Sequence, residues 1–318
     1  GPIGLVIGNE GNGVGKLIRE KCKAPEAAIH FLPGATQANF IVHAAALSPI
    51  QSVICPDSGH VYAHEAGSIE NTGHKLVPLP STDGKISAEQ IREVAASYYN
   101  SGEPNYICEP KMVYISFPTE WGTIYSEQEL REIRKVCDEY GMYLFADGAR
   151  LGYGLGSVKN DLTLEKLAEL TDVFYIGGTK CGALFGEALV ITNKKLARKF
   201  RTYMKQNGAV MAKGWLLGMQ FCSLLEDGTY EKMTAQADAY ALEIKAAFKE
   251  KRIREYVESY TNQLFVVLTK EQAEVLGKEY IFEYLQDLAD GSMVVRFCTS
   301  WATTEAEKDQ LIRDIRAL

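Results

Sequence analysis

Short apolar runs alternate with segments of helical period along the first two thirds of this 318-residue chain. A strand buried on both faces is a nearly continuous apolar run, whereas an amphipathic helix repeats its apolar positions every three or four residues. The alternation predicts a largely parallel sheet covered by helices on both faces. The predicted strands are Ala28–Leu32, Ser52–Cys55, Lys75–Leu79, Val113–Phe117, Tyr143–Ala146, Val173–Ile176 and Glu187–Thr192.

Capping signals support the helices predicted between these strands. Ser87 with Gln90, and Ser126 with Glu129, have the spacing of a capping box, in which each side chain bonds the backbone N–H of the other residue. The predicted helices of this part are Thr36–Leu47, Glu65–Asn71, Ser87–Tyr98 and Glu127–Tyr140.

The pattern changes from about Lys194, where longer helical stretches begin. We predict helices at Lys194–Gln206, Ala212–Leu225, Tyr230–Lys251 and Glu305–Ala317, and strands at Gln263–Leu268 and Met293–Cys298. The change indicates a large α/β domain over residues 1–230 and a small C-terminal α+β domain over residues 231–318. No linker-like segment separates them, so we expect them to pack as one rigid body.

Composition narrows the class of protein. A net charge of −7 disfavours nucleic-acid binding, which needs concentrated Lys and Arg, and no run of 18 apolar residues predicts a membrane span. Seven scattered cysteines without a CxxC pair favour reduced thiols in a cytoplasmic protein, and no spacing indicates a metal site. Because the chain opens with Gly1-Pro2 rather than Met, we expect native N-terminal residues to precede this numbering.

Polar motifs follow four of the predicted strands, where ligands gather in open α/β sheets. They are Pro33–Thr36, Asp57–His60, Asp147–Arg150 and Gly177–Lys180. Each motif alone is a weak signal. A Gly-Gly-Thr-Lys turn is usually a β-turn and lacks P-loop spacing, Asp147 could cap a helix, and His60 could be an ordinary loop residue.

The order of these motifs resembles that of fold-type I pyridoxal 5′-phosphate (PLP) enzymes, and within them the L-threonine aldolase and β-eliminating lyase family. The resemblance runs from about Gly11 to the end of the chain. It implies a mostly parallel seven-stranded sheet sandwiched by helices, with a small C-terminal domain. The matching stretches are Phe31–Asn39, His60–Gly67, Thr119–Thr123, Ala146–Leu151 and Gly177–Lys180.

The resemblance also implies roles for individual residues. The Lys180 amine would condense with the PLP aldehyde, and Asp147 would keep the ring nitrogen protonated, so that the ring absorbs the electrons released at Cα. His60 would stack on the ring and take the proton of a substrate β-hydroxyl. The residues that match the phosphate-binding segment are Gly34, Ala35 and Thr36.

Two arginines match residues that hold the substrate carboxylate. They are Arg150 and Arg296, and for Arg296 an ion pair with a protein carboxylate is the alternative. Glu120 stands where one branch of the family has a histidine, so it could transfer a proton, and the bulky Trp121 could reshape the pocket. In this family an N-terminal segment supplies a serine to the substrate carboxylate. The sequence as numbered contains no residue before Gly1 that could supply it.

The predicted function is cleavage of L-threonine, L-allo-threonine or related β-hydroxy-amino acids to glycine and an aldehyde by a PLP-dependent lyase. We expect a homodimer or homotetramer with active sites at the subunit interface. Two alternatives stay open: β-elimination or another amino-acid lyase reaction, and a catalytically silent binding protein that keeps the fold. A dinucleotide-binding oxidoreductase is disfavoured, because no GxGxxG stands between a strand and a helix.

Overall fold

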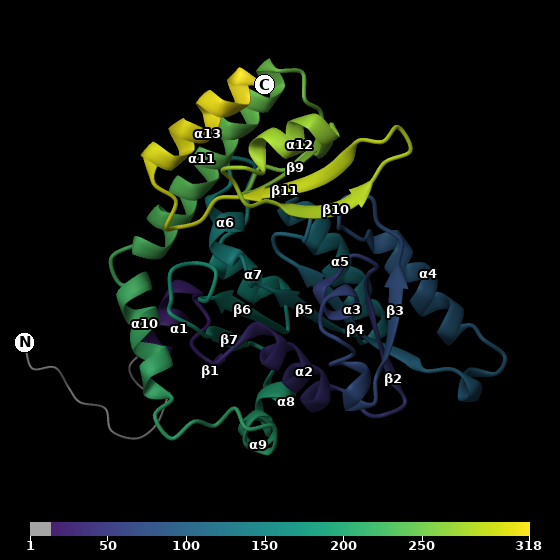
Figure 1. The fold of residues 1–318 in the computed structure, drawn as a ribbon. Coiled ribbons are helices and arrows are strands. Elements are labelled where there is room, and N and C mark those ends of the chain that lie inside the picture. The colour runs from purple at the N-terminus through teal and green to yellow at the C-terminus, as the bar shows by residue number, and fades with distance from the viewer. Residues whose placement is uncertain (1–13) are drawn as a thin grey trace, which may run out of the picture.

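Two β-sheets of different size organise the computed structural model, which describes residues 14–318 (Figure 1). The larger sheet has the strand order β1-β7-β6-β5-β4-β2-β3. Only β7 runs antiparallel to its neighbours, so the predicted mostly parallel seven-stranded sheet is confirmed. Its strands are β1 (Ala28–Leu32), β2 (Gln51–Pro56), β3 (Lys75–Leu79), β4 (Glu109–Ser116), β5 (Tyr143–Asp147), β6 (Val173–Gly177) and β7 (Glu187–Ile191).

Helices cover both faces of this sheet, because successive side chains of a strand point to opposite faces. In β5, Leu144 and Ala146 enter one apolar core, whereas Phe145 enters the other. The first core is closed by α1 (Val14–Lys21), α4 (Ala88–Tyr99), α5 (Glu127–Tyr140), α6 (Leu151–Gly156), α7 (Leu164–Leu170) and α10 (Trp215–Leu225). The second is closed by α2 (Ala35–Ala46), α3 (His60–Ala63), α8 (Lys194–Ala197) and α9 (Phe200–Gln206).

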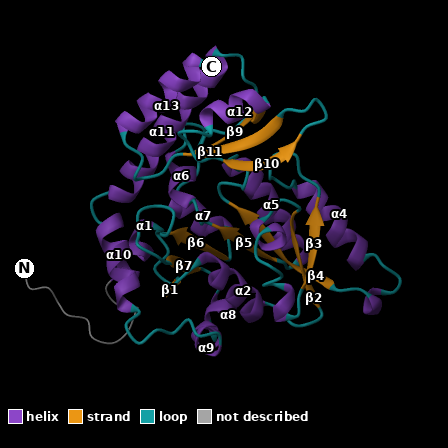
Figure 2. Ribbon diagram, viewed as in Figure 1, coloured by secondary structure: helices purple, strands orange, loops and turns teal. Residues whose placement is uncertain are grey.

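The smaller sheet is antiparallel throughout and has its own apolar core with α11 and α13 (Figure 2). The first half of α11 contributes Ala237 to a core of the large sheet, and the second half contributes Phe248 to the small one. The domain boundary at residues 230/231 stays a prediction, and it falls in the first turn of α11. The elements are α11 (Thr229–Glu250), β8 (Glu255–Val257), β9 (Gln263–Leu268), α12 (Lys270–Leu276), β10 (Glu283–Asp287), β11 (Met293–Cys298) and α13 (Glu305–Ala317).

The predicted helix Glu65–Asn71 is wrong. The segment is a bend followed by the 3₁₀ turn η1 (Glu70–Thr72), because Ala66 and Gly67 adopt positive φ angles of 51° and 73°, which end any right-handed helix. The predicted helix Lys194–Gln206 is divided into α8 and α9. A second 3₁₀ turn, η2 (Pro104–Tyr106), precedes β4. Both predicted capping boxes are present, so their helices begin where expected.

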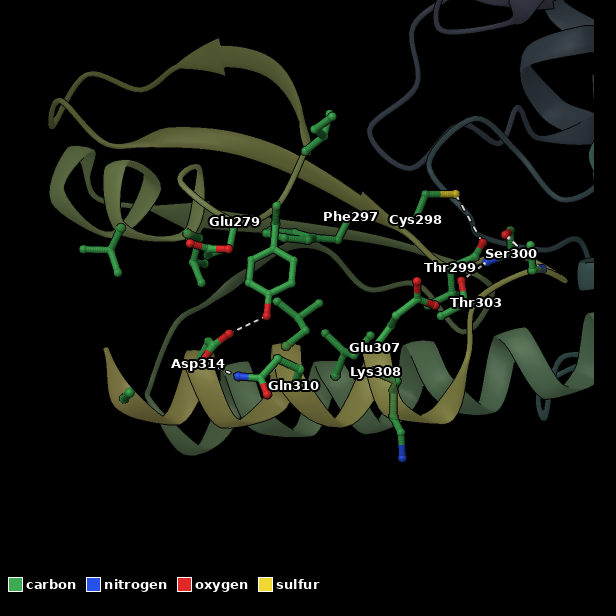
Figure 3. A pocket seen from close by; sticks show the side chains of 18 residues that line it. Glu279, Phe297, Cys298, Thr299, Ser300, Thr303, Glu307, Lys308, Gln310 and Asp314 are labelled. Atoms are coloured by element: carbon green, nitrogen blue, oxygen red, sulfur yellow. Dashed lines mark hydrogen bonds between the residues drawn. The ribbon is translucent and has the colours of Figure 1, made fainter.

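The small domain contains a cavity of about 990 Å³ that holds none of the predicted site residues (Figure 3). Its lining includes Phe297 of β11, Leu311 of α13, and Tyr280, which lies between α12 and β10. The Tyr280 hydroxyl donates to Asp314. All seven cysteines lie within residues 14–318 as free thiols. In the same part of the chain, no helix is both long and apolar enough to span a bilayer.

Asp238 of α11 is a buried carboxylate that lies beside α6. Its side chain is 2% exposed, and neither oxygen makes a hydrogen bond of normal geometry to a described residue. Burial raises the pKa of Asp238 from 3.8 to about 9, although the nearby backbone N–H of Asn262 acts in the opposite direction. The carboxyl group is therefore protonated at neutral pH.

This raised pKa makes stability depend on pH in a defined direction. Between about pH 4 and about pH 9 the folded chain keeps a proton that the unfolded chain has lost, so stability falls as pH rises through that window. Asp238→Asn removes this contribution. Within this window, the free energy of unfolding of the variant should rise relative to that of wild type by up to about 1.4 kcal/mol per pH unit, as measured by urea unfolding.

Asp227→Asn is the matched control. Asp227 lies exposed before α11, and its bonds to Thr229 lower its pKa below 3.8, so it stays ionised across the window. Its substitution should leave the pH slope unchanged. A slope for Asp238→Asn that is parallel to wild type would contradict the assignment of Asp238 as a neutral buried acid.

Candidate active site

A small cavity lies at the carboxyl ends of β4, β5 and β6, where parallel strands bring their following loops together. Six of the residues predicted from the sequence line it: Ala35, His60, Glu120, Asp147, Arg150 and Lys180. The remaining wall is made by Ser116, Pro118, Thr119 and Ala149.

Asp147 is a buried carboxylate at the last position of β5. Its Oδ2 accepts hydrogen bonds from the Tyr114 hydroxyl at 2.6 Å and from Asn39 Nδ2 at 3.1 Å. Its Oδ1 accepts from the backbone N–H of Ala149 at 2.9 Å. Three donors satisfy the buried carboxyl group and fix its orientation at the bottom of the cavity.

Lys180 enters the cavity from the turn that follows β6. Its amine has no hydrogen bond or ion pair with any residue between 14 and 318. Burial lowers the pKa of Lys180, and the charges of Arg150 and Arg296 lower it further, whereas Asp147 and Glu187 act in the opposite direction. A lysine with a lowered pKa is partly neutral, which is the form that attacks a carbonyl carbon.

His60 and Glu65 form a hydrogen-bonded pair that the sequence pattern did not indicate. His60 Nδ1 lies 2.8 Å from Glu65 Oε1. The same Glu65 oxygen accepts from Asn39 Nδ2 at 2.7 Å, and Oε2 accepts from the Ser68 hydroxyl at 2.7 Å. The bond to Glu65 raises the pKa of His60, while burial opposes the rise. Asn39 therefore links the His60 pair to Asp147.

Glu120 lies above the ends of β4 and β5 with one oxygen engaged and one free. Oε1 accepts from the His60 backbone N–H at 2.8 Å and from the Ser116 hydroxyl at 2.6 Å. Oε2 is buried and has no partner in the described part of the chain. Burial raises the pKa of Glu120, and the negative charge of Asp147 adds to the rise. A carboxyl group with a raised pKa holds its proton to higher pH than a solvated glutamate does.

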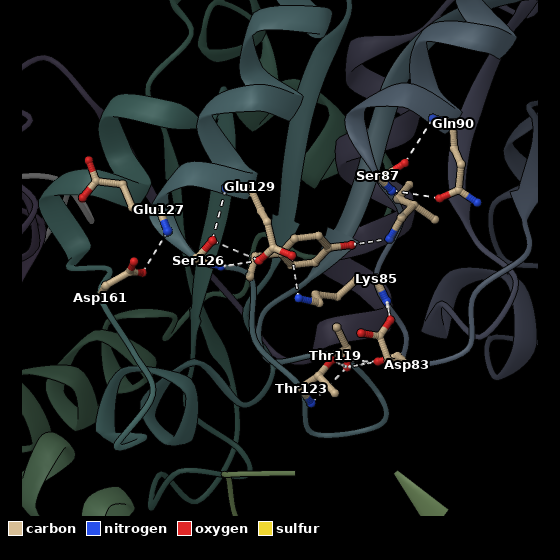
Figure 4. Close-up of polar contacts among 12 residues, drawn as sticks. Asp83, Lys85, Ser87, Gln90, Thr119, Thr123, Ser126, Glu127, Glu129 and Asp161 are labelled. Carbon is tan, nitrogen blue, oxygen red and sulfur yellow. Dashed lines mark hydrogen bonds and ion pairs between the residues drawn. The ribbon is translucent and has the colours of Figure 1, made fainter. Parts of the chain in front are cut away.

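The turn that carries Glu120 is tied to the loop before α4 (Figure 4). The Thr119 and Thr123 hydroxyls lie 2.7 Å apart, and both bond the carbonyl of Asp83. Trp121 is absent from the cavity lining. Its ring packs against Phe265 of the small sheet at a centroid distance of 4.9 Å. Trp121 thus joins the turn to the small sheet and does not reshape the cavity directly.

The predicted phosphate segment lies at the N-terminus of α2. Gly34 is the N-cap, and Ala35 and Thr36 begin the helix. The first N–H groups of a helix lack partners within the helix, and the helix dipole favours an anion beside them. A Cβ added at Gly34 would meet no atom within 4 Å, so this end of the helix is open.

The two predicted arginines occupy different surroundings. Arg150 is the N-cap of α6 and lines the cavity. Arg296 of β11 lies outside the lining, where it pairs with Glu283 and donates to Gln263 Oε1 at 3.0 Å. The sequence left open whether Arg296 forms an ion pair with a protein carboxylate, and in the structure it pairs with Glu283. Arg296 still lies close enough for its charge to affect the pKa of Lys180.

This set of donors fits PLP. The cofactor presents an aldehyde, a ring nitrogen and a phosphate, and the chain presents an unpartnered amine at Lys180, a buried carboxylate at Asp147 and an open helix N-terminus at Gly34. The residues of this network that the sequence pattern did not single out are Asn39, Glu65, Tyr114 and Ser116. Each acts through a contact with a residue distant in the sequence or in a neighbouring turn.

Comparisons with known proteins agree with this geometry. The family model for β-eliminating lyases matches residues 17–271. A low-specificity L-threonine aldolase of a Pseudomonas strain is 31% identical over 95% of this chain and 85% of its own length. The solved structure of Leishmania major threonine aldolase superposes with a TM-score of 0.92 at 43% identity, over 96% of this chain and 88% of that one.

A more distant solved structure extends the likeness in fold alone. An aspartate aminotransferase variant of Thermus thermophilus superposes with a TM-score of 0.70 at 14% identity, over 96% of this chain and 81% of that one. The family model matches residues 17–271, which are most of this chain. The chain therefore belongs to the β-eliminating lyase family and is a PLP-dependent lyase of fold type I.

Proposed function

We propose that this enzyme cleaves the Cα–Cβ bond of L-threonine, L-allo-threonine or a related β-hydroxy-amino acid, releasing glycine and an aldehyde. The observation that carries the proposal is His60, which is bonded to Glu65 and lines the same cavity as Lys180 and Asp147. Cleavage of this bond begins with removal of the β-hydroxyl proton, and a histidine ordered by a carboxylate is a suitable base. The names of the Pseudomonas and Leishmania relatives support the same reaction.

Three groups of the chain would hold the cofactor. Lys180 would bind its aldehyde carbon, Asp147 would face its ring nitrogen, and the N-terminus of α2 from Gly34 to Thr36 would face its phosphate. When bound, PLP supplies the electron sink for the pair released at Cα.

His60 accepts the β-hydroxyl proton at Nε2 while its Nδ1–H stays bonded to Glu65. The carboxylate fixes the ring orientation, and it stabilises the positive charge that His60 gains with the proton. Glu120 is the second proton-transfer group, because its unpartnered Oε2 belongs to a carboxyl with a raised pKa. Arg150 and Arg296 bind the substrate carboxylate, and Arg296 must then leave or share Glu283.

β-Elimination is the second candidate reaction, because the matched family model describes that chemistry. It would use the same Lys180 and Asp147 but would release a keto acid and ammonia. A protein that keeps the fold and binds without catalysis is the remaining alternative. The identity of the product separates all three.

The proposal includes a homodimer or homotetramer. The loop after Lys180 and the neighbouring helix α10 expose apolar side chains, which we call the Leu184 patch. Gln220 of α10 bonds the backbone of both Leu184 and Phe185, and Leu184 is 90% exposed. Such patches mark interfaces on soluble proteins. Further exposed apolar side chains in α10 or just before it are Met211, Trp215, Leu216 and Met219.

A second copy on this patch would place the subunit interface beside the active site. The proposal also places the enzyme in the cytoplasm, because seven unpaired thiols are typical of a reducing compartment.

Lys180→Ala should abolish both cofactor attachment and turnover. Removing the amine removes the only covalent bond between this chain and the cofactor in the proposed mechanism. The wild type should keep a visible absorbance band of bound PLP after dialysis and release acetaldehyde from L-threonine. The variant should do neither. Lys195→Ala, on the surface helix α8, is the control that should behave as wild type. Ammonia and a keto acid as the products would favour β-elimination.

Glu65→Gln should lower kcat and move the acid limb of the pH profile of kcat/KM. Because the bond to Glu65 raises the pKa of His60, its loss lowers that pKa. The neutral base then persists to lower pH, so the limb shifts to lower pH. We expect kcat to fall by roughly tenfold, a part of what general-base catalysis contributes. Ser68→Ala, which removes only a distal bond to Glu65, should shift the limb less.

Leu184→Asp should reduce the oligomer to a smaller species in sedimentation velocity. A charge at the centre of an apolar interface leaves a buried group unpaired. Ile281→Asp, at a fully exposed position of the small domain, is the control that should leave assembly intact. A wild type that sediments as a single chain would sink the oligomer proposal.

A further inference from the structure

Glu187 is a buried carboxylate next to the cofactor-binding turn that has no role in the proposed reaction. It lies on β7, is 2% exposed, and forms no ion pair with any residue from 14 to 318. Its Oε2 accepts from the backbone N–H of Gly178 at 2.9 Å, and its Oε1 accepts from the Thr179 hydroxyl at 2.9 Å. Burial of a charge without a cation is costly, so the carboxylate needs an explanation.

The turn from Gly178 to Lys180 is held from two sides. On one side Gly186 accepts from the N–H groups of Gly178 and Thr179 at 3.1 and 3.2 Å, and its own N–H bonds the Thr179 hydroxyl at 2.9 Å. On the other side the Tyr153 hydroxyl bonds the carbonyl of Lys180 at 2.6 Å. Glu187 adds two bonds to the first side, so the backbone position of Lys180 depends on it.

Glu187 also contributes to the electrostatic environment of the Lys180 amine. Its charge and that of Asp147 raise the pKa of Lys180, against the stronger lowering by burial and Arg150. Burial raises the pKa of Glu187 itself from 4.5 to about 7, while the bonds from Gly178 and Thr179 lower it. The charge of Glu187 therefore appears as pH rises through neutrality.

Other ionisable groups face these two residues from the surrounding elements. Those that interact with Glu187 are Asp147, Tyr175, Lys180, Cys181 and Tyr230. Those that interact with Lys180 are His60, His64, Asp147, Arg150, Glu187 and Arg296. Two acidic side chains thus raise the pKa of Lys180, and two arginines lower it.

We propose that Glu187 is the positioning residue of Lys180: its carboxylate accepts the bonds of Gly178 and Thr179 and so fixes the turn that carries the lysine. The charge of Glu187 acts on the Lys180 amine in addition. The inference rests on the proposed function in that Lys180 binds the cofactor. A Lys180 not bound to the cofactor would be a free amine in the cavity, and the charge of Glu187 would act on its protonation state.

The test measures the reactivity of Lys180 in cofactor-free protein. Trace acetylation with acetic anhydride, followed by peptide mass spectrometry, reports the neutral fraction of an amine. The rate is normalised to the surface residue Lys195 and recorded from about pH 6 to about pH 10. Glu187→Gln removes the charge and keeps the size, whereas Glu187→Asp keeps the charge and shortens the reach. Asp238→Asn is the control, because Asp238 is equally buried but lies on α11.

At about pH 8 Lys180 should react about threefold faster, or more, in Glu187→Gln than in wild type. The difference should vanish by about pH 6, where Glu187 is protonated in wild type. Glu187→Asp should stay close to wild type, and Asp238→Asn should match it. Equal rates in Glu187→Gln and wild type at about pH 8, or an equal change in Asp238→Asn, would overturn the proposal.

A second variant decides the matter if Glu187→Gln does not fold. Thr179→Val keeps the Glu187 carboxyl group but removes one of its hydrogen-bond donors. Because that bond lowers the pKa of Glu187, its loss raises this pKa. The charge of Glu187 slows the reaction of Lys180 above a certain pH, seen as a break in the plot of Lys180 reactivity against pH. In Thr179→Val this break should lie at higher pH than in wild type, and an unmoved break would contradict the inference. Borohydride reduction of the holoenzyme, with peptide mapping, tests the proposed function separately. Attachment of the cofactor to another lysine would refute the proposed role of Lys180 in binding the cofactor. The acetylation experiment on cofactor-free protein does not depend on that outcome.

Discussion

The hydrogen bonds that converge on the carboxyl group at the end of β5 are the interaction on which the rest of the site depends. Tyr114, Asn39 and the backbone of Ala149 donate to Asp147. These three donors satisfy a buried carboxyl group and fix the direction in which it would face a cofactor ring nitrogen. The Asn39 amide also donates to Glu65, so two carboxylates share one donor group and are held at a fixed separation.

Four carboxyl groups in and beside the cavity differ in how many hydrogen bonds they accept. Asp147 has three donors, and Glu65 has donors on both oxygens besides its contact with His60. Glu120 and Glu187 have two donors each, and the pKa of each is raised. Glu187, whose pKa is raised to about 7, can therefore change protonation near neutral pH.

The small sheet completes the site through a few specific contacts. Arg296 of β11 approaches from this sheet, and Gln263 of β9 bridges it to the Glu120 carbonyl with bonds of 3.0 and 3.4 Å. Trp121 packs on Phe265 of β9, which fixes the Glu120 turn against the small domain. The alignment of the two sheets thus sets the distance between Arg296 and Glu120.

The sequence alone determined the strands of the large sheet, two capped helices, and the placement of Lys180, Asp147 and His60 at strand ends. These features depend on apolar period and short motifs, which are local. The edge strand β10 escaped prediction because it is mostly exposed and has no apolar pattern. The partners Asn39, Glu65 and Tyr114 were decided by tertiary structure. A hydrogen bond such as that from Asn39 to Asp147 spans 108 positions, and only the packing of α2 against the sheet brings its two ends together.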